Sequence, residues 1–385
     1  MLITIIAFIL ILSVLVFAHE FGHFWTAKKF GAKAEEFGFG FPPRIFGWKK
    51  KNGKRKFFWG GQDEESEDTI YSINWIPIGG FVKIKGEDGE SKNDPESFAS
   101  KKPWKRGIIL SAGVTMNVLL CIVCLIIAFM LGAPQIVESD DQMVKDPKIQ
   151  IMSVLDESPA KEAGLTMGDV LISIDGQQFA QVEEVQLFIG QKDQQEVTVV
   201  VERLGEQSEY QITAEIINET GNAGLGVGLV KTGIVSYPWY KAIWLGFKGT
   251  WNMFTQIIVA FATIIKNAFT GQEIGADIAG PVGIAVITGR VARMGISYIL
   301  QFTALLSMNL AIINFLPLPA LDGGRVLFLI IEKIRGRAVN QKVEQIVHTI
   351  GFFALMLLIV VVTGKDLWRF RESFANLWHG IVSIF

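Results

Sequence analysis

Cysteine, histidine and net charge are all scarce in this 385-residue chain, which has two cysteines, four histidines and a formal net charge of −2. The two cysteines, Cys121 and Cys124, cannot build a disulfide framework. They lie three positions apart in an apolar run, where packing is a more frequent role than redox or metal chemistry. The near-zero net charge gives no indication of a nucleic-acid partner, and we expect none.

The N-terminal segment lacks the basic residues that open a secretory signal peptide. Residues 3–17 are almost wholly apolar, and the motif described next follows where a cleavage site would lie. The chain as a whole is 50% hydrophobic, with a mean hydropathy of +0.36, which predicts several membrane spans. We therefore interpret residues 1–30 as a retained transmembrane helix.

Inside this first span stands the sequence His19-Glu20-Phe21-Gly22-His23. On a helix, two histidines four positions apart share one face, so their imidazoles can bind one Zn²⁺ ion. Glu20 is adjacent to the first ligand and can take a proton from water at the metal. Ionisable groups inside an apolar span are costly unless they serve a function, which favours a metal site over a chance match.

A second candidate ligand follows a later apolar segment, residues 296–318. Pro317 and Pro319 break this helix and free its backbone, and Asp322 comes directly after the break. Catalytic zinc requires three protein ligands and an open position, so Asp322 is predicted as the third ligand rather than an ordinary capping residue. We interpret His348 and His379 as structural. Asn117, in the span at 107–132, either bonds a neighbouring helix or lines a polar cavity.

Basic residues set the expected topology. Lys/Arg-rich segments at 31–106 and 325–342 are predicted to be cytoplasmic, which leaves the N-terminus and residues 133–232 extracytoplasmic. If residues 238–269 also crossed the membrane, Asp322 would lie at the opposite face from the histidines. We therefore predict four spans, with interfacial or peripheral helices before the third span. The predicted segments after the first two are 107–132 (span 2), 236–293 (peripheral helices), 294–324 (span 3), 325–342 (cytoplasmic loop), 343–364 (span 4) and 365–385 (tail).

Two further segments carry β-strand patterns. In 31–106, alternating aromatics and an Asn52-Gly53 turn predict a small sheet at or dipping into the membrane, with an edge free to pair with an extended peptide; a loop region without catalytic role is the other interpretation. In 133–232, a short helix from Ser158, a Gly turn, a strand and an Asp175-Gly176 turn follow in order. This pattern resembles a PDZ domain, and the chain has room for one copy.

Together, the His19–His23 helix, the single inserted PDZ-like domain and the segment Asn314–Gly324 resemble the site-2 protease family of intramembrane zinc metalloproteases, in particular the bacterial regulator-of-sigma-E protease type. The resemblance covers nearly the whole chain. It implies a polytopic α-helical membrane protein of the bacterial inner membrane with four transmembrane helices, a membrane-associated β-loop and one extracytoplasmic PDZ domain. The best-known enterobacterial members have two PDZ domains in tandem.

The same resemblance implies a metalloendopeptidase that cuts membrane proteins within or near a transmembrane segment, often after another protease has trimmed them. Examples are anti-sigma factors and remnant signal peptides. His19, His23 and Asp322 would bind Zn²⁺, and Glu20 would act as general base. The residues implied to bind substrate are Asn314, Pro317, Pro319, Gly80, Phe81 and Val82. A non-catalytic PDZ-containing membrane scaffold, and an anchored protease that cuts soluble loops, are the competing hypotheses.

Overall fold

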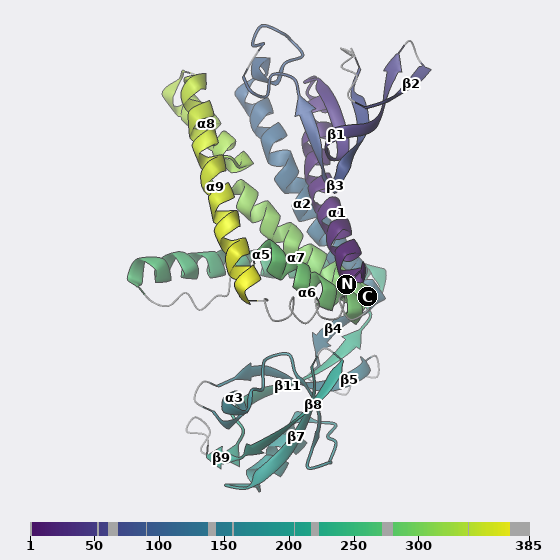
Figure 1. The fold of residues 1–385 in the computed structure, drawn as a ribbon, viewed down its shortest axis with the longest axis vertical. Coiled ribbons are helices and arrows are strands. Elements are labelled where there is room, and N and C mark those ends of the chain that lie inside the picture. Colours follow the sequence, from purple (N-terminus) through teal and green to yellow (C-terminus); the bar gives the residue numbers. More distant parts are fainter. Residues whose placement is uncertain are drawn as a thin grey trace, which may run out of the picture. The chain divides into compact units, whose positions relative to one another are not determined.

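The fold was analysed in a computed structural model of the whole chain (Figure 1). The structure describes residues 2–51, 54–60, 68–89, 91–137, 144–155, 158–203, 205–216, 223–271, 280–337 and 339–369. The predicted Asn52-Gly53 turn, His379 and most of the predicted tail lie outside these residues. The chain divides into two compact units, the first made of Met1–Leu125 with Trp244–Phe385 and the second of Ile126–Ile243.

Four helices of the described chain are long and apolar enough to cross a membrane, as the sequence predicted. These are α1 (Leu2–Lys29), α2 (Pro103–Leu131), α7 (Ile296–Phe315) and α9 (Gln341–Arg369). The first helix ends at two lysines, and Gly31 follows with φ +73°, a conformation that stops a helix readily because glycine has no Cβ. A short 3-10 helix, η1 (Phe98–Ser100), precedes α2.

The segment predicted to be peripheral forms two helices, α5 (Trp239–Thr270) and α6 (Pro281–Met294). Neither is among the helices apolar enough to span in the described chain. Helix α6 begins at Pro281, where a missing backbone N–H is tolerated because the first turn leaves that donor without an intrahelical partner. The buried carboxylate of Asp366, on α9, accepts the N–H of Gly283 at 2.7 Å and so satisfies another donor of that turn.

Helix α8 (Asp322–Arg335) occupies the first part of the segment 325–342, which its basic residues predicted to be a cytoplasmic loop. Apolar residues recur through this basic segment at helical spacing, and Leu329 is buried against the core formed by α1, α2 and β3. The high density of charge obscured this amphipathic pattern. Helix α8 ends at Gly336, which has φ +67°.

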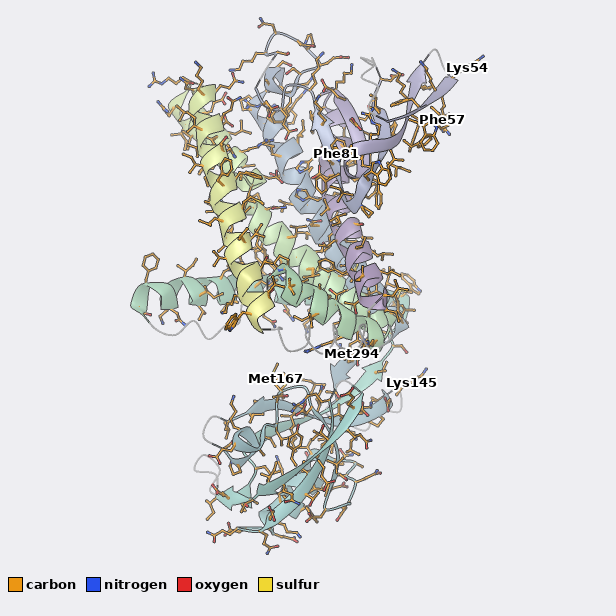
Figure 2. The ribbon with its side chains drawn as sticks, viewed as in Figure 1. Lys54, Phe57, Phe81, Lys145, Met167 and Met294 are labelled. Atoms are coloured by element: carbon orange, nitrogen blue, oxygen red, sulfur yellow. The ribbon has the colours of Figure 1, made fainter. Side chains whose placement is uncertain are left out.

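A bent three-stranded antiparallel sheet follows α1, in the order β2-β1-β3. Its strands are β1 (Ala34–Lys51), β2 (Lys54–Trp59) and β3 (Ile70–Ile84). Several bulges interrupt the β1–β3 register, and they allow these long strands to curve. Many of its apolar side chains are exposed, among them Trp59, Trp75 and Phe57, the last of which is labelled in Figure 2.

Strand β3 lies along α1, the first candidate span (Figure 1). The Ser13 hydroxyl donates to the carbonyl oxygen of Pro77 at 3.0 Å and accepts the N–H of Gly79 at 3.4 Å. Ser13 lies about 24 Å from the Lys29 end of α1, at 1.5 Å per residue. The sheet therefore reaches the middle of the predicted span rather than stopping at its end.

The second unit contains a six-stranded antiparallel sheet with two short helices. The strand order is β4-β11-β5-β6-β7-β8, and a minor pair is formed by β9 and β10. The bounds are β4 (Ala133–Ile136), β5 (Val144–Val154), α3 (Pro159–Ala163), β6 (Val170–Ile174), α4 (Val182–Gly190), β7 (Glu196–Arg203), β8 (Glu206–Thr213), β9 (Glu215–Ile216), β10 (Ala223–Gly224) and β11 (Val227–Val235).

One apolar core holds this unit together, and alternate residues of β7 supply Val197, Val199 and Val201 to it. The buried Asp169 carboxylate, at the turn into β6, accepts two hydrogen bonds from the Arg203 guanidinium at 2.6 and 2.7 Å. It also accepts the N–H of Thr166 at 2.9 Å. Asp169 therefore ties the turn after α3 to β7. The helix, Gly turn, strand and Asp-Gly turn occur in the order that the sequence pattern predicted.

Candidate metal centre

The two histidines of α1 and Asp322 come together in the first unit, although about three hundred residues separate them. His19 Nε2 lies 3.2 Å from His23 Nε2. The Asp322 Oδ2 atom lies 3.0 Å from the first and 3.3 Å from the second. Both histidines are buried, each 7% exposed. The spacing of four residues places both imidazoles on one face of α1, as predicted, and the end of helix α7 brings the Asp322 side chain to them.

A six-residue connection joins α7 to α8 and lets Asp322, the first residue of α8, reach the histidines. Leu316 leaves α7 in an extended conformation, and α8 begins at Asp322. A Cβ on Gly323 would collide with the carbonyls of Phe315 and Leu316, and one on Gly324 would collide with the carbonyl of Leu318. The two glycines after Asp322 therefore allow the first turn of α8 to pack on the backbone of the preceding turn.

The opposite ring nitrogens of the histidines are also engaged. His23 Nδ1 lies 2.8 Å from the carbonyl oxygen of Ile109, which can only accept, so this nitrogen carries a proton. His19 Nδ1 lies 3.2 Å from the side-chain amide of fully buried Asn117. The Asn117 Oδ1 atom has no partner among the described residues, and rotation of the amide places it as the acceptor of an Nδ1–H. Both imidazoles can thus present a free Nε2 lone pair.

Helix α2 approaches α1 closely at this level through two glycines. A Cβ on Gly22 would stand 2.7 Å from the carbonyl carbon of Ala112. A Cβ on Gly113 would stand 2.8 Å from His19 Nε2 and would collide with His23 Nε2. The absence of a side chain at Gly113 therefore leaves the space that the two imidazoles occupy.

The three converging atoms fit a zinc ion. With both histidines protonated at Nδ1, two Nε2 lone pairs and a carboxylate oxygen face one another at 3.0–3.3 Å. Acceptors at this spacing repel unless protons or a cation lie among them. Tetrahedral ligands about 2.0–2.1 Å from zinc lie roughly 3.3 Å apart, which is close to the observed separations. Asp322 Oδ2 is buried without a hydrogen-bond donor among the described residues, as expected for a metal ligand.

The sheet positions the Glu20 carboxylate. Its Oε2 atom accepts the backbone N–H of Val82, on β3, at 3.1 Å. From Ser13 to Glu20 the helix rises about 10 Å, and from Gly79 to Val82 the strand advances by a similar length, so both contacts form in register. Because the Val82 N–H donates to Glu20, it is engaged in this structure and not free for an added peptide strand.

The other predicted substrate-binding residues lie on two separate elements. Gly80 and Phe81 are on β3. Gly80 packs on α1, since a Cβ added to Gly80 would lie 3.7 Å from the Cα of Phe17. Asn314 is half-buried in the last turn of α7. Pro317 and Pro319 are in the connection between α7 and α8. No contact in the described chain tests their binding of substrate, and their role stays a prediction.

Sequence reasoning did not connect two supporting residues with the metal ligands. Asn117 bonds two neighbouring helices: its side-chain amide lies against His19 of α1, and its backbone carbonyl accepts the Ser307 hydroxyl of α7 at 2.8 Å. His348, interpreted as structural, accepts the N–H of Ala320 at 2.9 Å. A polar residue within an apolar span was the available indication in both cases. Cys121 and Cys124 are buried, as packing residues would be.

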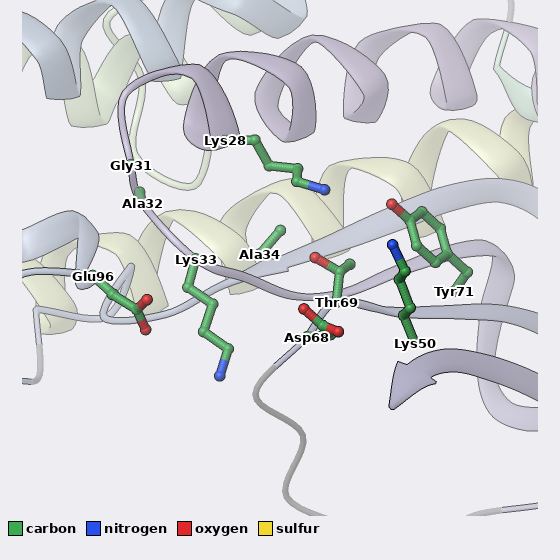
Figure 3. A pocket seen from close by; sticks show the side chains of 10 residues that line it. All are labelled: Lys28, Gly31, Ala32, Lys33, Ala34, Lys50, Asp68, Thr69, Tyr71 and Glu96. Carbon is green, nitrogen blue, oxygen red and sulfur yellow. The ribbon is translucent and has the colours of Figure 1, made fainter. Parts of the chain in front are cut away.

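Two cavities lie apart from the converging ligands. One, of about 320 Å³, opens beyond the end of α1, where the ammonium groups of Lys28 and Lys50 face the Tyr71 hydroxyl (Figure 3). The other, of about 490 Å³, is bordered by Arg325 and His348. None of His19, His23 or Asp322 lines either cavity.

Comparison with known proteins identifies the family. The model of peptidase family M50 matches residues 7–358. The regulator of sigma-W protease RasP of Bacillus subtilis is 30% identical over 450 residues, covering 95% of this chain and 98% of that protein. Zinc metalloprotease RasP of Bacillus licheniformis is likewise 30% identical, over 452 residues, covering 95% and 99%.

Among solved structures, the PDZ domain of the SdrC-like protein of Listeria monocytogenes is 28% identical, covers 21% of this chain and 85% of that domain, and has a TM-score of 0.20. The family is decided instead by the match across 7–358 and by the near full-length relatives, which confirm the predicted site-2 protease resemblance, the metalloendopeptidase activity and the zinc cofactor. The chain therefore belongs to peptidase family M50, and it is a zinc metalloprotease.

Proposed function

We propose that this protease hydrolyses peptide bonds within or beside a transmembrane segment of its substrates, using His19, His23 and Asp322 as zinc ligands and Glu20 as general base. The observation that carries the proposal is the convergence of three ligand atoms at 3.0–3.3 Å inside an apolar helix pair. Zinc bound there would polarise the scissile carbonyl and acidify a water molecule. Glu20 would take the proton of that water and deliver it to the leaving amine.

Substrate access follows from the sheet beside α1. A transmembrane helix hides its peptide bonds in internal hydrogen bonds, so the substrate must unwind before cleavage. Strand β3 runs next to Glu20 and reaches the level of Ser13, which supports a membrane-dipping sheet that receives the unwound segment by strand addition. We propose that Gly80, Phe81 and Val82 contact the substrate, Val82 through groups other than the N–H that Glu20 accepts, and that Asn314 holds the substrate backbone from the α7 side.

The remaining assignments concern topology and partners. The lysines at the end of α1 and the basic residues of α8 support a cytoplasmic location for the sheet and for α8, which leaves the second unit extracytoplasmic. We propose that this unit is a PDZ domain that admits substrates already trimmed by another protease. The relative of Bacillus subtilis is named a regulator of sigma-W protease, so an anti-sigma factor with one transmembrane segment is the first substrate to test.

The decisive experiment compares cleavage of a tagged single-span substrate in membranes by the wild type and by Glu20→Gln. Loss of a positioned general base lowers such rates by about 10²–10⁴-fold. The matched control is Glu206→Gln, at an exposed position of β8, and this variant is expected to cleave the substrate normally. Equal product from wild type and Glu20→Gln would refute the proposal and favour a non-catalytic membrane scaffold.

A further inference from the structure

The last transmembrane helix, α9, touches the turn that precedes Asp322. His348 Nδ1 accepts the backbone N–H of Ala320 at 2.9 Å. Three residues further on, a Cβ on Gly351 would stand 2.8 Å from the carbonyl carbon of Pro319 and 2.9 Å from its oxygen. Positions three apart share one face of a helix, so a single face of α9 packs on the turn and bonds to it.

Two backbone hydrogen bonds lie within this turn, from the Leu318 N–H to the Leu316 carbonyl oxygen at 2.7 Å and from the Leu321 N–H to the Leu318 carbonyl oxygen at 3.3 Å, and neither involves Ala320. Pro317 and Pro319 have no N–H to donate. Ala320 has φ +73°, a left-handed conformation that residues with a Cβ adopt only where the surroundings hold them. The His348 side chain provides the hydrogen-bond acceptor at this strained residue, two positions before Asp322.

We propose that His348 is a positioning residue for the zinc site: it fixes the Ala320 turn and thereby aims the Asp322 carboxylate at His19 and His23. The inference rests on the proposed function, since it takes Asp322 as the third ligand. The ring is itself fixed by Phe328 of α8, with ring centroids 5.6 Å apart. The Nε2 atom of His348 has no hydrogen-bond partner among the described residues, so the hydrogen bond of the ring there is the one that Nδ1 accepts from Ala320.

The acceptor itself can be tested by two substitutions of His348 in the full-length protein. Asparagine places its side-chain oxygen near the position of Nδ1, whereas leucine fills similar space and accepts nothing. Zinc affinity is measured in detergent by competition with a chromogenic chelator, using zinc ions alone as the probe. The melting temperature of each zinc-free protein is measured in parallel, and Asp322→Ala is carried as the reference for loss of a ligand.

We expect His348→Leu to bind zinc about 10–100-fold more weakly than the wild type, the usual effect of losing a residue that orients a ligand. His348→Asn should retain wild-type zinc affinity, and the two zinc-free variants should have the same melting temperature. Wild-type affinity in His348→Leu, or equal weakening in His348→Asn, would overturn the inference, because the hydrogen bond would then not matter. If His348→Leu does not fold, His348→Gln replaces it, since its oxygen extends past the Nδ1 position.

The same measurements distinguish failure of the proposed function from failure of the inference about His348. If the wild type binds no zinc, or Asp322→Ala binds it as tightly as the wild type, then Asp322 is not the third ligand and both conclusions fall. If Asp322→Ala loses zinc while His348→Leu keeps it, the proposed function stands and only the positioning role of His348 is refuted.

Discussion

Replacing Gly113 by alanine should disable the metal site without touching a ligand. Gly113 lies on α2, and its missing side chain faces both imidazoles of α1. A Cβ there would stand 2.7 Å from His19 Cε1 and 2.8 Å from His19 Nε2, and it would collide with His23 Nε2. Alanine is otherwise the better helix former by about 1 kcal/mol, so propensity alone predicts stabilisation.

The size of the effect follows from the overlap. Carbon and ring atoms pack at roughly 3.5–4.0 Å, so the methyl group must push the imidazoles away by about 1 Å. Zinc–ligand distances vary by only about 0.2 Å, so neither histidine can yield that much and still bind with Asp322. We therefore expect zinc affinity to fall at least about 10–100-fold and cleavage to fall with it.

The assay is zinc affinity in detergent together with cleavage of a single-span substrate, and the chain offers a matched control. Gly107 lies six residues earlier on the same helix, and a Cβ there meets nothing within 4 Å. Gly107→Ala is therefore expected to bind zinc and cleave as the wild type does. Wild-type zinc affinity in Gly113→Ala would refute the reasoning, because it would mean that α2 does not approach the histidines this closely.

Three further predictions concern the ligand, the metal and the second unit. Asp322→Ala should abolish cleavage and lower zinc content, and unchanged values of both would exclude it as the third ligand. Zinc chelation should stop cleavage, and added zinc should restore it; activity that persists at zero measured zinc would contradict this. Arg203→Ala should destabilise the second unit by about 1–3 kcal/mol in urea unfolding, because it leaves the buried Asp169 carboxylate without its main donors. Burial acts to raise the pKa of Asp169, but the hydrogen bonds from Arg203 and Thr166 outweigh burial and lower that pKa. In the wild type this stabilisation is therefore complete above about pH 4 and is lost as the pH falls below it. If the difference in unfolding free energy between variant and wild type did not change from pH 6 to pH 3, this reasoning would be contradicted.

The sequence predicted the elements whose signal is local. Residues 2–29 read as a span because they are a continuous apolar run, and His19 and His23 share a face because any helix places them so. The proposed third ligand was also accessible, since Asp322 follows two prolines that break the helix. Each of these inferences needs only neighbouring residues and the geometry of one element.

Helix α8 and the supports of the ligands could not be read in this way. The segment from Asp322 to Arg335 places six consecutive apolar residues, 326–331, between charged residues, and its basic charge suggested a cytoplasmic loop; in the structure Leu329 packs in the core formed by α1, α2 and β3. The Val82–Glu20 contact depends on the register of a strand against a helix, which no local pattern specifies. His348 lies 28 residues from Ala320, and nothing in either sequence neighbourhood pairs them.

These supports share a physical cause. An apolar environment makes any unpaired backbone group costly, so every break in regular structure needs a partner from another element. The broken helix after α7 frees the N–H of Ala320, and His348 accepts it; the outer edge of β3 frees the N–H of Val82, and Glu20 accepts it. The broken helix carries the proposed third ligand, and the strand edge adjoins the proposed base. The chain therefore fixes its catalytic groups with the same backbone irregularities that bring them to the metal, which is why a motif of ligands alone understates how many residues the site requires.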